Sequence, residues 1–186
     1  YIKVLNKDSE NKWLIETPTD FESHLNDLGN MPLPPYIKRE RENEYSEEDK
    51  DRYQTVYAKI PGAIAAPTAG LHFTPEIIKT LKDQGTQFTE VTLHVGLGTL
   101  KPVKCEDIKD HIMHEEFYTI PQKTAEIINA YKKEGKRIIP VGTTSIRTIE
   151  TVASKNNGKI EASSGWSNIF IHPGFNFNVT NAFITN

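Results

Sequence analysis

Four short segments of the sequence concentrate side chains that can move protons or hold an anion. They are residues 65–74, 93–99, 111–118 and 141–150. Imidazole titrates near neutral pH, and guanidinium groups bind carboxylates and phosphates through paired hydrogen bonds. The sequence therefore predicts a site for acid–base chemistry on a ligand that carries an anionic group.

The first segment, residues 65–74, places two hydroxyls, an imidazole and an aromatic ring just before a helix. The side chains concerned are Thr68, His72, Phe73 and Thr74. Small neighbours let a ligand approach the backbone, and the first N–H groups of the helix are free to bind it. Thr74 before a proline is equally typical of a helix N-cap, so a tight turn without chemistry is the alternative.

The second segment, residues 93–99, ends a strand with a histidine and a turn. His94 closes the strand, and Gly96, Gly98 and Thr99 follow it. Ligands of α/β proteins gather beyond the carboxyl ends of strands. A third glycine and an immediate helix are missing, so a nicotinamide cofactor is not expected, and a structural turn is the alternative.

The third segment, residues 111–118, carries two imidazoles, two carboxylates and a phenol. His111 and His114 are three residues apart, so they could share a helix face and bind zinc together with a carboxylate. Their order matches neither of the zincin patterns, which favours acid–base or ligand-orienting work for these side chains and for Tyr118. A solvated, charged face is the alternative.

The fourth segment, residues 141–150, delivers Gly-Thr-Thr-Ser to the start of a helix. Backbone N–H groups, the hydroxyls of Thr143 and Thr144 and the helix dipole predict an anion seat there. The lysine of a P-loop is missing, so hydrolysis of a nucleoside triphosphate is not indicated. We expect Arg147 to clamp the anion; an ordinary surface ion pair with Glu150 is the alternative.

The elements that must position these segments alternate between helices and strands. Capping residues and hydrophobic periodicity predict helices over residues 75–84, 121–134 and 145–154, and strands over residues 86–95 and 137–141. Two successive strand–turn–helix units predict an α/β fold in which helices bridge parallel strands, as a layer or a barrel. Two more strands are expected within residues 166–186.

The beginning of the chain has a different pattern. Two strand-like runs separated by a polar turn predict a hairpin over the first 16 residues, and a short helix over residues 19–28 follows. The proline-rich connector that ends near residue 36 marks a boundary. We expect residues 1–36 to belong to a small β-rich domain with its connector and residues 37–186 to an incomplete α/β catalytic domain, with residues 38–51 as a solvated excursion.

Composition excludes several classes of protein. The 186 residues include 22 Lys and Arg against 25 Asp and Glu, a net charge of -3, so a generally basic nucleic-acid binder is not expected. A single cysteine, Cys105, excludes an internal disulfide and a cysteine-rich zinc cluster. No apolar run approaches the roughly 20 residues of a membrane span, and the N-terminus has no signal-peptide layout, so a cytoplasmic location is expected.

Taken together, these segments resemble the S-adenosylmethionine:tRNA ribosyltransferase-isomerase family of queuosine biosynthesis. The resemblance covers nearly all of the chain from residue 33 onward, and it implies that the first residues are part of a small inserted β-barrel domain and that the chain is a central portion of a longer enzyme. Ala63 and Ile146 depart from the family pattern without touching the imidazoles or the hydroxyl cluster. The matching stretches are residues 33–37, 51–58, 65–74, 92–99, 111–118, 141–150 and 165–166.

The resemblance implies the reaction. The ribosyl part of S-adenosylmethionine would be transferred to 7-aminomethyl-7-deazaguanine at the tRNA wobble position and isomerised, giving epoxyqueuosine-tRNA, adenine and methionine. S-adenosylmethionine would be a consumed substrate, with no separate cofactor, no metal and no membrane involved. A base must remove a proton beside the sulfonium, and an acid must assist the departure of adenine.

Within that reaction we expect His94 or His114 to be the base, and His72 or Glu116 to assist at adenine. Arg147 and the helix start would hold an anion. The remaining expected substrate-binding residues are Thr68, Phe73, Thr74, Gly96, Gly98, Thr99, His111, Tyr118, Thr143, Thr144 and Glu150.

Two other classes of function compete with this reading. An RNA-binding module without chemistry would interleave aromatic and basic residues on a sheet face, and the sequence instead places its unusual residues at strand ends and helix starts. A metal-dependent hydrolase would use His111, His114 and a carboxylate. Candidate tRNA contacts near the glycine turn are Lys101, Lys104 and Lys109, with solvated surface lysines as the alternative.

Overall fold

The computed structural model describes residues 1–8, 13–21, 23–24, 33–34, 37–38, 47–96 and 113–186. The chain forms two compact units: Tyr1–Pro32 with Arg39–Tyr45, and Leu33–Lys38 with Ser46–Asn186. No helix of the described part is long and apolar enough to cross a membrane.

The first unit contains the expected hairpin. Strand β1 (Lys3–Lys7) pairs with β2 (Trp13–Glu16) in antiparallel register, with an irregularity between Val4 and Asn6. Of the helix expected next, residues 25–28 lie outside the described residues, and Phe21 begins a helical stretch. The hairpin prediction is confirmed.

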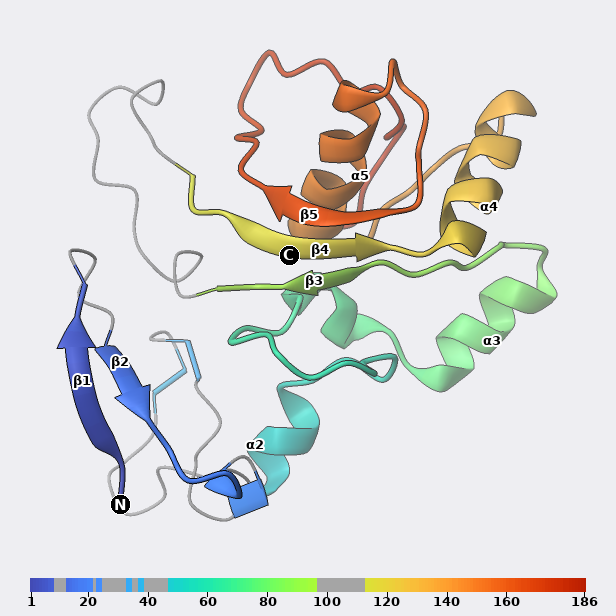
Figure 1. Cartoon of the computed structure of the whole chain (residues 1–186). Coiled ribbons are helices and arrows are strands. Elements are labelled where there is room, and N and C mark those ends of the chain that lie inside the picture. Colours follow the sequence, from blue (N-terminus) through green and yellow to red (C-terminus); the bar gives the residue numbers. More distant parts are fainter. Residues whose placement is uncertain (9–12, 22, 25–32, 35–36, 39–46, 97–112) are drawn as a thin grey trace. The chain divides into compact units, whose positions relative to one another are not determined.

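The second unit is built on a three-stranded sheet in the order β3–β4–β5 (Figure 1). Its strands are β3 (Thr92–His94), β4 (Glu116–Ile120) and β5 (Ser163–Ser167), and both pairings are antiparallel. The mixed α/β class is confirmed, but the expected parallel pairing was wrong for this sheet. Hydrophobic patterning identifies a strand without giving its direction. In addition, no strand was predicted at β4, which lies between β3 and β5 and begins within the third segment.

The helices follow their sequence signals closely. Helix α3 (Pro75–Asp83) is capped by Thr74, whose Oγ1 accepts a hydrogen bond from the N–H of Ile77 at 3.3 Å. Helix α4 (Gln122–Lys133) begins after Pro121, and α5 (Thr143–Lys155) begins after Gly142. These three helix predictions are confirmed to within two residues at each end. Part of the expected solvated excursion is instead a short helix, α2 (Glu47–Arg52).

The core lies between the sheet and the two later helices. Alternate residues of β4 are buried, and Tyr118 and Ile120 pack with α4 and α5, so one face of the sheet is covered (Figure 1). Burial of this apolar surface is the main term that holds the second unit together. The buried members of the cluster are Tyr118, Ile120, Ala125, Ile128, Ile149, Val152, Ala153, Ile160 and Val179.

The segment expected as a strand over residues 137–141 forms only an isolated parallel bridge, from Val141 to Ile184. Backbone hydrogen bonds continue on both sides of it: Asn181 N–H donates to Ile138 O at 3.0 Å, and Gly142 N–H donates to Ile184 O at 2.8 Å. Pro140 removes one backbone donor from this ladder, which limits it to a bridge. The two strands expected within residues 166–186 are likewise reduced to the end of β5 and this bridge.

Candidate functional site

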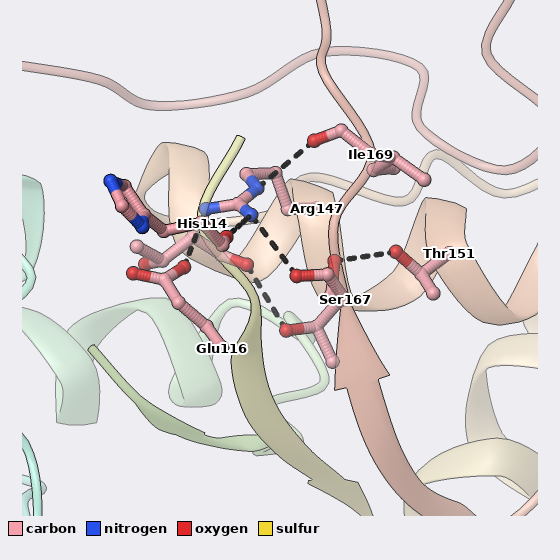
Figure 2. A network of polar contacts seen from close by, with 8 residues as sticks. His114, Glu116, Arg147, Thr151, Ser167 and Ile169 are labelled. Carbon is pink, nitrogen blue, oxygen red and sulfur yellow. Dashed lines mark hydrogen bonds and ion pairs between the residues drawn. The ribbon is translucent and has the colours of Figure 1, made fainter. Parts of the chain in front are cut away.

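Arg147 is the centre of a buried polar network that joins the third and fourth segments (Figure 2). Its side chain is 9% exposed and that of Glu116 is 2% exposed, and Arg147 Nη1 lies 2.5 Å from Glu116 Oε2. A buried guanidinium is tolerable only when its charge and its donors are both satisfied. The carboxylate of β4 supplies the charge that the arginine of α5 requires.

Three backbone carbonyls accept the other hydrogen bonds of this arginine. Nε donates to Ile169 O at 3.2 Å, and Nη2 donates to Ser167 O at 3.2 Å and to His114 O at 3.3 Å. The guanidinium thus fastens β4 and the chain after β5 to α5. Its expected role as a clamp for a substrate anion stays a prediction, and in this structure its acceptors are internal.

The network continues to the next turn of α5. The hydroxyls of Thr151 and Ser167 lie 2.7 Å apart, and both residues are buried (Figure 2). Figure 2 also shows that the imidazole of His114 is turned away from the guanidinium. The contact between the two residues is made by the backbone carbonyl oxygen of His114, which accepts from Arg147. His114 is exposed, so its ring is available to solvent.

Glu150 has a different partner from the one its spacing suggested. Its carboxylate is fully buried and accepts hydrogen bonds from the backbone N–H groups of Asn178 (2.8 Å), Val179 (3.1 Å) and Thr180 (2.8 Å). Burial acts to raise the pKa of this carboxyl, but these hydrogen bonds outweigh it and hold the pKa below its ordinary value. A surface ion pair with Arg147 was therefore the wrong alternative: both side chains are buried and face different partners.

His94 is held between a glycine and an aromatic ring. Its imidazole stacks on Phe117 of β4, with ring centroids 6.1 Å apart and an interplanar angle of 24°. On the other side, a Cβ on Gly62 would lie 2.5 Å from His94 Nδ1, and Gly62 has φ +131°. Only glycine fits there, so residue 62 allows the imidazole its position. The hydrogen bond from Ile64 N–H to Val95 O, at 2.9 Å, fixes this segment beside β3.

The first segment forms a 3₁₀ turn (Thr68–His72) followed by Phe73 as its C-cap. The small residues of this segment were expected to let a ligand approach the backbone. At Gly70 the group that approaches is a side chain of the protein, because a Cβ there would collide with the hydroxyl of Tyr57. His72 is exposed, and its Nε2 lies 2.9 Å from Asn186 Oδ1.

The first and fourth segments meet at the start of α5. A Cβ on Gly142 would lie 3.5 Å from Thr144 Oγ1 and 3.8 Å from Pro67 Cβ. Thr143 is exposed and Thr144 is half-buried, and the N-cap residue, Gly142, has no side chain with which to cap α5. The N–H groups of this helix start therefore lie close to the 3₁₀ turn, as an anion seat requires.

Some of the remaining predicted site residues lie within the part of the chain that the structure describes, and others lie outside it. Tyr118 is buried in the core, which favours a packing role, and Gly96 is half-buried after β3. In the described ranges, no group of three or more His, Cys, Asp or Glu side chains is arranged to hold a metal ion. The predicted residues that lie outside the described ones are Gly98, Thr99, Lys101, Lys104, Lys109 and His111.

Sequence reasoning overlooked the residues that pack around His94. Gly62 stands outside the four segments, and Phe117 stands inside one of them without having been selected. Their importance depends on strand register and on a close approach, and neither is visible in spacing along the chain. The available signal in the sequence was Phe117 itself, an aromatic residue within the third segment.

These features define a mixed α/β domain in which a buried arginine joins the third and fourth segments, His94 packs on the third segment, and the first segment meets the start of α5. The chain matches the family described as queuosine biosynthesis protein over residues 1–186, and it belongs to that family. The resemblance drawn from its motifs is confirmed.

Known relatives carry the name of an enzyme. The chain is 59% identical, over 166 residues, to the S-adenosylmethionine:tRNA ribosyltransferase-isomerase of Finegoldia magna. The aligned residues make up 89% of this chain and 46% of that protein. The enzyme of the same name from Natranaerobius thermophilus is 54% identical over 90% of this chain and 47% of that protein. The chain thus spans about half the length of the curated relatives it matches.

A solved structure is also similar. The crystal structure of S-adenosylmethionine tRNA ribosyltransferase from Thermotoga maritima is 37% identical, covers 63% of this chain and 35% of that chain, and superposes with a TM-score of 0.45.

Proposed function

We propose that the full-length protein transfers the ribosyl moiety of S-adenosylmethionine to 7-aminomethyl-7-deazaguanine at the wobble position of a tRNA and isomerises it, releasing adenine and methionine. The observation that carries this proposal is the match of the whole chain to the family, with relatives of that activity 59% and 54% identical. The presence of the four segments in one α/β unit is consistent with it.

His94 is the better of the two candidates for the base that removes the proton beside the sulfonium. It is half-buried, and Gly62 and Phe117 hold its ring in one orientation, whereas the ring of His114 is exposed. A base acts well only when its lone pair is held toward the proton it takes. The packing therefore supports His94 over His114.

His72 is the better candidate for assisting the departure of adenine. The carboxylate of Glu116 is buried and paired with the guanidinium of Arg147, so it is already engaged within the protein and does not face a substrate. His72 is exposed and has its Nε2 beside an amide oxygen, which suits an imidazole that donates. Glu116 then acts by positioning Arg147.

The methionine carboxylate of the donor requires an anion seat. The start of α5 offers Thr143 and Thr144 next to the 3₁₀ turn, and its N-cap residue, Gly142, has no side chain to cap the first N–H groups, which supports this location. Thr68, Phe73 and Thr74 would then line the same site from the turn.

Several broader expectations belong to this proposal. S-adenosylmethionine is consumed as a substrate, and its sulfonium supplies the activation, so no separate cofactor or metal is invoked. Residues 1–36 belong to a small β-rich domain and residues 37–186 to the catalytic domain, which becomes barrel-like in the full-length protein. The parallel bridge between Val141 and Ile184 supports that closure. A tRNA substrate supports a cytoplasmic location.

The experiment is mass spectrometry of a reaction that contains the full-length protein, S-adenosylmethionine and tRNA with the aminomethyl-deazaguanine base. Equimolar adenine and methionine, with the matching mass gain on the tRNA, are expected. His94→Ala should reduce the rate by at least about a hundredfold, and His172→Ala, which removes another exposed imidazole of the same unit, should leave it unchanged. Intact S-adenosylmethionine after incubation of the folded protein would refute the proposal.

A further inference from the structure

Three aromatic side chains form a row across the sheet of the second unit. Strand register places His94 of β3 opposite Phe117 of β4, and Phe117 opposite Trp166 of β5. The centroid of the Phe117 ring lies 6.1 Å from that of His94 and 5.4 Å from that of Trp166, which meets it edge-on at 68°. Opposed residues of antiparallel strands point to the same face, so the three rings share one side of the sheet.

This face is the one that the core does not use. Along β4 the buried residues alternate with half-buried ones, and Phe117 is among the latter. The core residues Tyr118 and Ile120 point to the opposite side, toward α4 and α5. Trp166 is 57% exposed, so much of its indole is open to solvent.

Polar groups accompany the rings on the same face. The hydroxyls of Thr119 and Ser164, two register pairs further along β4 and β5, lie 2.8 Å apart. Aromatic rings that stack on bases, with hydroxyls beside them that reach base edges or ribose, are the means by which sheet surfaces hold single-stranded RNA.

We propose that this aromatic row, made of His94, Phe117 and Trp166, ends in a stacking platform for an unpaired base of the tRNA substrate, the exposed indole of Trp166. The inference rests on the proposed function. To that function it adds a surface of the protein that binds the RNA, and it names Trp166 as a residue that determines the affinity for tRNA.

An RNA base suits this surface better than the adenine of the donor does. Small ligands bind in clefts that cover most of their surface, whereas the row ends in an indole that is 57% exposed. Its inner end is His94, the proposed base, so a base stacked on Trp166 would lie two strands away from the imidazole.

The first test measures steady-state kinetics of the full-length protein with Trp166→Ala, Trp166→Phe and Trp13→Ala. Trp13 is an equally exposed tryptophan of the first unit, at 58%, and is the matched control. Trp166→Ala should raise the KM for tRNA by about five- to a hundredfold, the value of one base stack, with the KM for S-adenosylmethionine unchanged. Trp166→Phe keeps a ring and should restore most of the affinity.

The second test uses fluorescence in a variant in which Trp166 is the only tryptophan. An anticodon stem-loop should quench its emission and protect it from acrylamide, and S-adenosylmethionine or adenosine should not. Quenching by the adenine compounds alone would assign the row to the donor, and an indole shielded from acrylamide before RNA is added would show that another part of the protein covers it. Each result would overturn the proposal.

Failure of this inference is distinct from failure of the proposed function. A wild-type protein that releases adenine and methionine, combined with a Trp166→Ala variant whose KM for tRNA is unchanged, refutes the stacking surface and leaves the reaction in place. Equal weakening by Trp13→Ala and Trp166→Ala would also refute it, because the effect would then be a general loss of exposed apolar area. A wild-type protein that binds tRNA without consuming the donor refutes the reaction alone.

Discussion

The free energy of unfolding should fall steeply when Glu150 is changed to glutamine. Oε1 of this carboxylate accepts from the N–H groups of Val179 and Thr180, and Oε2 accepts from the N–H and the Nδ2 of Asn178. Glutamine keeps the shape but replaces one oxygen by an NH₂ group, which would face two donors. Because each hydrogen bond to a buried charge is worth about 1.5–3 kcal/mol, the loss should be about 3–5 kcal/mol after partial relaxation.

The assay is urea unfolding followed by circular dichroism, together with a thermal scan in which Tm should fall by about 10 °C. Glu126→Gln is the matched control, since Glu126 is exposed on α4 and accepts a hydrogen bond from Gln122 one turn away. Its effect should stay within about 0.5 kcal/mol. If Glu150→Gln behaves like this control, the carboxylate does not organise residues 178–180, and the reasoning is refuted.

The pH dependence gives a second check on Glu150. Because its folded pKa is depressed, the carboxylate contributes its full stability above the unfolded pKa of about 4.3, and the contribution is lost as the pH falls through the lower folded pKa. The stability difference between wild type and Glu150→Gln should therefore be constant from about pH 6 to about pH 8 and shrink below about pH 4. A difference that grows on acidification would contradict this assignment of sign.

Three further changes test other parts of the structure. Gly62→Ala should displace the imidazole of His94 and reduce turnover by about a hundredfold with an unchanged fold, as measured by adenine release and circular dichroism; unchanged turnover would show that the ring position is unimportant. Arg147→Lys should cost about 2–4 kcal/mol in urea unfolding, because an ammonium cannot hold Glu116 and three carbonyls together, and a cost under about 1 kcal/mol would count against the network. Thr74→Ala should cost about 1 kcal/mol in the same assay and Thr74→Ser almost nothing, whereas equal costs would mean that the Oγ cap is not the cause.

Local structure was the part of the fold that the sequence revealed best. Thr74 with the proline after it marks the start of α3, and the glycine after residue 134 marks the end of α4, because capping is decided within a few residues. Strand direction was not accessible, since the patterns of β3 and β5 are the same for either direction and depend on where β4 inserts.

The candidate site was accessible only as a set of segments. Spacing correctly placed Arg147 and Glu150 on one helix, but it could not tell that both are buried or that their partners lie at residues 116 and 178–180. The aromatic row shows the same limit, because Phe117 and Trp166 are neighbours only through the register of β4 and β5. Side-chain types predicted the chemistry, and long-range pairing determined the partners.

The anchoring of residues 178–184 has a consequence for how the protein folds as it is synthesised. Glu150 holds the beginning of this stretch, and the hydrogen bonds of Pro140 and Gly142 with Ile184 hold its end, so it braces α5 at both its start and its middle. About forty residues separate Gly142 from Ile184, and contacts at such a separation form late. On the ribosome, α5 would remain unbraced, with the Glu150 carboxylate still in water, until residues 178–184 have emerged from the exit tunnel. The second unit would then acquire its packed form in one late step rather than segment by segment.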